Sequence, residues 1–157
     1  MPLIVNLRHL EEHNVRLCGK LPVDELDLET GDEMIRAAQP LQYDIEVQKL
    51  EGGLLVRGSL RLALECRCVR CLEPFTRELA LKAWTCHLPF EGEDAAAVVN
   101  DCVDLTPFAR EDMLLEFPRH PLCKPDCGGL KTKIGKARKT ADETAASAWA
   151  ELDKLKL

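Results

Sequence analysis

The chain has 157 residues, of which 46% are hydrophobic and 31% charged, a balance typical of a globular domain and not of a disordered chain. The formal net charge of −6 excludes a protein that is basic throughout, but the charge is unevenly distributed. Residues 1–118 carry 12 basic and 22 acidic side chains, whereas residues 119–139 carry 7 basic and 1 acidic. Because counterion release depends on the contacting patch, the segment 119–139 is the only polyanion-binding region that the sequence predicts.

Nothing in the sequence predicts export or membrane insertion. The first residues (Met-Pro-Leu-Ile-Val-Asn) lack the basic lead and the apolar stretch of a secretory signal. No window approaches the roughly 18 consecutive apolar residues of a membrane span. The eight cysteines are therefore expected in the reducing cytoplasm, as free thiols or metal ligands and not as disulfides.

In chain order, residues 3–8 are predicted to form a short strand, and the acidic stretch 11–38 is too weakly periodic to predict any element. Strict alternation then predicts a half-buried strand over 41–48, a glycine turn at 51–53, and a returning strand over 54–65. The predicted core face of this hairpin carries Leu41, Tyr43, Ile45, Val47, Leu54, Val56, Leu60, Leu62 and Leu64.

The second half of the chain predicts two more strands and a helix. Residues 75–89 alternate, with a slip between Leu81 and Trp84 that predicts a β-bulge, and residues 98–103 form a weaker strand candidate. Thr106 and Pro107 resemble an N-cap and a first helical residue. The helix that follows is expected to end before Pro118 and to bury Phe108, Met113, Leu114 and Phe117.

The predicted architecture is an α+β fold, in which an antiparallel, barrel-like sheet is covered by one or two helices and carries two cysteine knuckles. We expect a single domain over residues 1–139, whose last part is the basic segment 131–139. An alanine-rich helix or tail then occupies residues 140–157, with Trp149, Leu152 and Leu155 along one stripe.

The cysteine spacing is the strongest indication of chemistry. Cys68 and Cys71 lie three positions apart, and Cys123 and Cys127 lie four apart much later in the chain. Tetrahedral zinc takes four nitrogen or sulfur ligands, commonly two from each of two such knuckles. The pattern therefore predicts a zinc site made by these four cysteines, with His120 as an alternative ligand. Nearby basic residues would stabilise the thiolates: Arg67, Arg70 and Lys124.

Two other interpretations of these cysteines remain open at this point. They can be ordinary half-buried thiols, since free cysteine is among the most buried residue types. Cys68 and Cys71 can also form a redox pair, although such pairs usually open a helix in a βαβ unit and the flanks here are predicted strands. Cys66 lies on the predicted core face of its strand, and the remaining cysteines are expected to fill the core or surface: Cys18, Cys86 and Cys102.

Three segments carry a family resemblance. Segment 67–75 (Arg-Cys-Val-Arg-Cys-Leu-Glu-Pro-Phe) resembles the first signature of the YceD family, the large ribosomal RNA subunit accumulation proteins. Residues 104–118 resemble the helix before the second signature, and residues 120–130 resemble that signature itself. The resemblance extends over about residues 40–155. Many cysteine-rich members have two further cysteines where this chain has Lys131 and Ile134, so four sulfurs remain here, still a complete tetrahedral set.

The resemblance implies a non-enzymatic ribosome-biogenesis factor that supports accumulation of large-subunit ribosomal RNA. Its expected partners are that RNA, ribosomal proteins or a pre-ribosomal particle, with no membrane and no small-molecule substrate. Candidate RNA contacts are Lys124, Lys131, Lys133, Lys136, Arg138 and Lys139. The plainer interpretation of this run is a solvated linker.

Two other function classes are weighed against RNA binding. The acidic part of the chain could serve a protein-binding adaptor that makes no RNA contact, and a thiol oxidoreductase is the less favoured alternative. No catalytic residues are predicted, because none of the histidines stands in a nucleophile or metalloenzyme motif: His9, His13, His87 and His120.

Overall fold

The structure is a computed structural model and describes residues 2–28 and 31–130. Within these ranges the chain forms a five-stranded sheet, a three-stranded sheet and three short helices. The strands are β1 (Ile4–Asn6), β2 (Val15–Leu21), β3 (Ile35–Ala37), β4 (Leu41–Leu50), β5 (Gly53–Arg67), β6 (Pro74–Pro89), β7 (Val98–Val99) and β8 (Cys102–Asp104). The helices are the 3-10 helix η1 (Leu7–Leu10), α1 (Val23–Leu26) and α2 (Thr106–Leu115).

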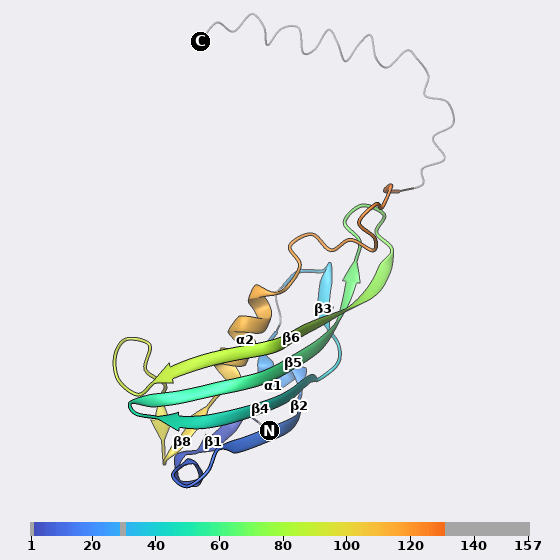
Figure 1. Ribbon diagram of the computed structural model, residues 1–157. Coiled ribbons are helices and arrows are strands. Elements are labelled where there is room, and N and C mark those ends of the chain that lie inside the picture. The colour runs from blue at the N-terminus through green and yellow to red at the C-terminus, as the bar shows by residue number, and fades with distance from the viewer. Residues whose placement is uncertain (1, 29–30, 131–157) are drawn as a thin grey trace, which may run out of the picture.

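The large sheet is antiparallel, with strand order β2-β4-β5-β3, and β6 pairs with β5 along its other edge. Figure 1 shows this sheet curled like half a barrel, with the long β5–β6 hairpin projecting beyond it at one end. The predicted alternation is confirmed, because the leucines, isoleucine and valines of the inner face are buried while Tyr43 is partly buried. The predicted antiparallel, barrel-like α+β architecture is therefore confirmed.

The predicted β-bulge is present in β6. Gly58 pairs with Trp84, but Leu60 pairs with Leu81, so Lys82 and Ala83 together oppose the single residue Ser59. An extra residue on one strand bends that strand and redirects its side chains. The slip in alternation that the sequence shows is thus a real change of register.

The core lies between the inner face of the large sheet and a layer made by α1, α2 and the small sheet. The small sheet has the order β1-β8-β7. Leu26 of α1, Met113 of α2, and Val5 and Val103 of the small sheet join the same buried cluster as the inner residues of β4 and β5. Apolar burial on this one face of the sheet is the main stabilising term, at about 25 cal/mol per Å².

The start of α2 differs from the prediction. Leu105 is the N-cap and Thr106 is the first helical residue. The Thr106 hydroxyl does not cap the helix but accepts a hydrogen bond from the backbone N–H of Leu3 at 2.8 Å. The backbone N–H of Thr106 donates to Asp104 Oδ1 at 2.9 Å. The buried face is also narrower than predicted. Ala109 and Met113 are fully buried, but three of the four residues predicted to be buried are only partly so: Phe108, Leu114 and Phe117.

Two other predictions about the secondary structure need correction. The single strand predicted over 98–103 is a hairpin, because Asn100 and Asp101 adopt left-handed φ angles of 53° and 61° and reverse the chain between β7 and β8. The predicted strand 3–8 ends early, where Leu7 begins η1. The unassigned stretch 11–38 contains β2, α1 and β3.

The predicted basic segment 131–139 and the predicted tail 140–157 lie outside the described residues, so the domain boundary at residue 139 stays a prediction. In the part of the chain that is described, no helix has the length and apolar character needed to cross a membrane.

Candidate metal centre

The first knuckle connects the end of β5 to the start of β6. The backbone N–H of Cys68 donates to Glu73 O at 3.0 Å, and the N–H of Leu72 donates to Cys68 O at 2.9 Å. Leu72 adopts a left-handed φ of 61°, which costs a non-glycine residue free energy but closes the turn after Cys71. This tight turn brings the side chains of Cys68 and Cys71 to the same side of the loop.

The second knuckle follows α2 and packs against the first. The N–H of Cys127 donates to Lys124 O at 3.2 Å, which closes a short turn. Hydrogen bonds to backbone carbonyls join the knuckles: Val69 N–H donates to Pro121 O at 2.9 Å, and Arg70 Nη1 donates to Cys127 O at 3.0 Å. Segments that are far apart in the sequence therefore lie side by side at one end of the β5–β6 hairpin (Figure 1).

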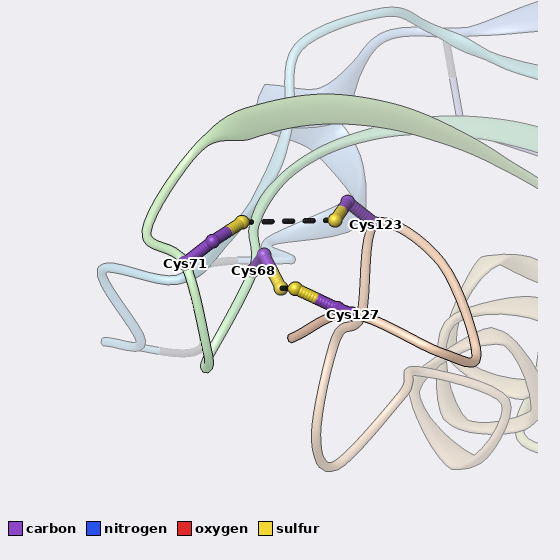
Figure 2. Close-up of side chains that lie close together, drawn as sticks. All are labelled: Cys68, Cys71, Cys123 and Cys127. Carbon is purple, nitrogen blue, oxygen red and sulfur yellow. Dashed lines mark hydrogen bonds between the residues drawn. The ribbon is translucent and has the colours of Figure 1, made fainter. Parts of the chain in front are cut away.

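The sulfur atoms of the four cysteines converge between the two knuckles. Figure 2 shows Cys71 facing Cys123, with 3.6 Å between their Sγ atoms, and Cys68 facing Cys127, with 3.7 Å. All four Sγ atoms lie within 4.8 Å of one another. A tetrahedral ion with metal–sulfur bonds of about 2.3 Å requires sulfur–sulfur distances of about 3.8 Å. The four cysteines therefore have the arrangement needed to hold one metal ion.

The surroundings of Cys68 and Cys123 shift the pKa values of these two thiols in opposite directions. Backbone amides of Cys123 and Cys71 point at the sulfur of Cys68 and lower its pKa to about 6, so this sulfur favours the thiolate. Burial, followed by the neighbouring sulfurs, raises the pKa of Cys123 to about 12. Four thiolates this close repel each other, and a cation that replaces their protons relieves the repulsion.

The structure brings together all four cysteines that the spacing singled out. His120 is exposed and lies outside the cluster, and Cys66 is buried in the core, where burial raises its pKa. Cys18 is exposed, and Cys86 and Cys102 are half-buried. None of the eight cysteines forms a disulfide.

The contacts that support the cluster were only partly foreseen. The side chains of Arg67, Arg70 and Lys124 were expected to stabilise the thiolates, but the main causes of the lowered Cys68 pKa are backbone amides. The guanidinium of Arg70 instead holds the second knuckle through the carbonyl of Cys127. The contact between Val69 and Pro121 was missed, and no local sequence signal predicts it. Lys124 is exposed, while the remaining candidate RNA contacts lie beyond residue 130.

Similar proteins are found in mycobacteria. A protein of Mycobacterium tuberculosis and one of Mycobacterium bovis, both named as uncharacterized, are each 29% identical over 103 residues, covering 60% of this chain and 50% of theirs. An uncharacterized protein of Mycobacterium leprae is 26% identical over 110 residues, covering 65% of this chain and 51% of its own. The chain thus spans about half the length of the curated relatives it matches. No solved structure matches it.

A family model matches most of the part of the chain that carries the site. It covers residues 56–156, from β5 through both knuckles, and is described as large ribosomal RNA subunit accumulation protein YceD. The match includes all four clustered cysteines and the helix α2 between the two pairs. The chain therefore belongs to the YceD family of large ribosomal RNA subunit accumulation proteins.

Proposed function

We propose that this protein is a non-enzymatic, cytoplasmic factor that supports accumulation of large-subunit ribosomal RNA during ribosome assembly. The observation that carries the proposal is the family match over residues 56–156, because the family is described by this effect and not by a reaction. The curated relatives are about twice as long as the part of them that matches this chain. The role of the whole protein is therefore a proposal.

The cysteine cluster has a structural role in this proposal. Cys68, Cys71, Cys123 and Cys127 would hold one zinc ion, which binds thiolates strongly and prefers the tetrahedral arrangement. Four protein ligands leave no open position for water or substrate, so the ion would stabilise the fold and would not catalyse a reaction. It would fix the second knuckle against the first.

The proposed partners are large-subunit ribosomal RNA and ribosomal proteins in a pre-ribosomal particle. Lys124 is exposed on the second knuckle, and by sequence the basic residues Lys131, Lys133, Lys136, Arg138 and Lys139 follow it within a short distance. A local cluster of cations gains affinity for phosphate by counterion release even on an acidic protein. Residues 1–118, with their excess of acidic side chains, would complement basic ribosomal proteins.

Depletion of the protein from its own cell tests this role directly. We expect the amount of large-subunit ribosomal RNA to fall relative to small-subunit RNA, because an assembly factor that is missing leaves its RNA exposed to degradation. Re-expression of the wild-type chain should restore the ratio, which quantitative RNA sequencing or gel analysis measures. An unchanged ratio in cells that lack the protein would contradict the proposed function.

A further inference from the structure

A second group of basic residues gathers on the outer face of the large sheet, opposite the core. We define the outer face by the side chains that alternate with the buried ones on three neighbouring strands. Cross-strand pairing places them in rows of Arg16, Glu46 and Arg57, then Cys18, Asp44 and Ser59, then Lys20, Gln42 and Arg61. Paired residues of an antiparallel sheet point to the same side, so these nine side chains share one surface.

The β-bulge adds a further cation to this face. Lys82 lies in the bulge opposite Ser59, at the edge of the sheet. It lines a surface hollow of about 330 Å³ together with Arg16 and Arg57, and it also lines a separate hollow with Asp112 and Glu116. A neighbouring hollow of about 300 Å³ is lined by Lys20 and Arg61, among others. Asp44 and Ser59 line both hollows, so the two adjoin on one surface, where basic residues outnumber the acidic Asp44 and Glu46.

Of the two acidic residues on the outer face, Asp44 is neutralised by an ion pair with Arg16 and Glu46 keeps its charge. Asp44 accepts two hydrogen bonds from Arg16, at 2.8 Å from Nε and 2.7 Å from Nη2. Glu46 accepts a hydrogen bond from Asn14 Nδ2 at 2.7 Å. Four cations remain that form no ion pair or side-chain hydrogen bond within residues 2–28 and 31–130: Lys20, Arg57, Arg61 and Lys82. With the Arg16–Asp44 pair balanced, these four cations share the outer face with the single carboxylate of Glu46, so the face keeps a net positive charge.

The arrangement fits an extended polyanion. Arg57 and Arg61 point outward from the same strand, four residues and therefore about 13 Å apart. Lys82 lies beside the interval between them on β6, and Lys20 lies two strands away in the same row as Arg61. Arg57, Arg61 and Lys82 thus lie in a line along the β5–β6 pair, and Lys20 extends the group toward β2. An extended row of cations suits a charged backbone better than one small anion.

The side chains of the outer face indicate how a nucleic acid would be contacted. None of the outward-pointing residues in the three rows is aromatic. Tyr43, which its pairing with Leu60 places on the inner face, is the one aromatic residue among the described residues that line either hollow. Proteins that bind single strands stack bases on aromatic side chains, whereas double-stranded RNA is recognised through phosphates and 2′-hydroxyls. The chemistry of this face therefore matches the backbone of a duplex.

We propose that the outer face of the large sheet binds the phosphate backbone of double-stranded RNA through Lys20, Arg57, Arg61 and Lys82. This inference rests on the proposed function, because it names the form of RNA that such a factor contacts and adds a surface separate from the knuckles. The sheet provides a rigid platform, and the second knuckle carries the sequence-predicted basic segment. RNA contact is thereby divided between two parts of the chain.

Binding of the full-length protein to an RNA duplex of about 20 base pairs, measured over a series of salt concentrations, tests the inference. The double variant Arg57→Gln, Arg61→Gln should bind about tenfold more weakly and flatten the dependence of log affinity on log salt by about two units. The matched control is Arg8→Gln, Arg110→Gln, which removes the same charge from exposed ion pairs with Asp101 and Asp27. The control should bind within about twofold of the wild type, since its residues lie off the outer face.

The outcomes separate the inference from the proposed function. A wild-type protein that binds neither duplex nor single-stranded RNA overturns RNA contact altogether. If the wild type binds duplex and the outer-face variant behaves like the control, the outer-face inference fails while an RNA role through Lys131, Lys133 and Lys136 survives. Stronger binding to a single strand of the same sequence overturns the preference for duplex. Unchanged RNA binding with lost pre-ribosome association would assign the outer face to an acidic protein instead.

Discussion

Replacing Cys68 or Cys127 by serine is expected to abolish binding of the proposed zinc ion and to lower the thermal unfolding temperature. Each change removes one of four thiolates whose sulfur atoms lie within 4.8 Å of one another. A ligand that binds only the folded chain stabilises it by about 4 kcal/mol at a thousandfold excess over its dissociation constant. The hydrophobic core includes no residue of the two knuckles. We therefore expect the knuckles to unfold before the core does.

Cys18→Ser is the matched control for this prediction, because Cys18 is an exposed free thiol outside the cluster. It should retain one zinc ion per chain and the wild-type unfolding temperature. Metal content by atomic emission and unfolding curves with and without a chelator give both quantities. Equal metal content in all three variants would exclude a site shared by the two knuckles.

Gly58→Ala is expected to destabilise the protein by roughly 3 kcal/mol or more, at the upper end of the costs of overpacking. A β-carbon at Gly58 would lie 2.2 Å from Asp44 O and 2.6 Å from the Cα of Ile45. Both atoms belong to the backbone of β4, so no side-chain rotation relieves the contact. The two strands would have to separate beside the β-bulge, in the middle of the sheet.

Gly128→Ala supplies the comparison, since a β-carbon there meets no atom within 4 Å. Its free energy of unfolding should stay within about 0.5 kcal/mol of the wild-type value. The midpoints of urea denaturation measure both effects, provided the slopes agree. Similar midpoints for the two alanine variants would show that β4 approaches β5 less closely than the structure indicates.

The hairpin and the bulge could be predicted because each follows from local alternation. In β4 and β5 the apolar residues alternate with polar ones, and one extra residue before Trp84 shifts that pattern visibly. β2 was not predicted, because it is an edge strand in which Val15 and Leu17 are only half-buried and the alternation carries little signal. The four-residue helix α1 is too short to show a helical period.

In the candidate site, too, the local features could be predicted from the sequence and the long-range contacts could not. The short spacing within each cysteine pair predicted which four cysteines form the cluster, because a tetrahedral ion takes four ligands and two such pairs commonly supply them. The left-handed Leu72 and the bond between Arg70 and Cys127 depend on how two distant segments pack, which no local pattern encodes. The basic outer face was hidden because its cations are scattered over three strands among acidic neighbours, and only the strand register brings them together.

The most direct test of the central claim is sedimentation of cell extract through a density gradient, with the tagged full-length protein followed against the ribosomal subunits. RNA that accompanies the protein would be sequenced from each fraction. A large-subunit assembly factor should be enriched with immature large subunits and carry their ribosomal RNA. A protein that remains at the top of the gradient, free of ribosomal RNA, would contradict the proposed role.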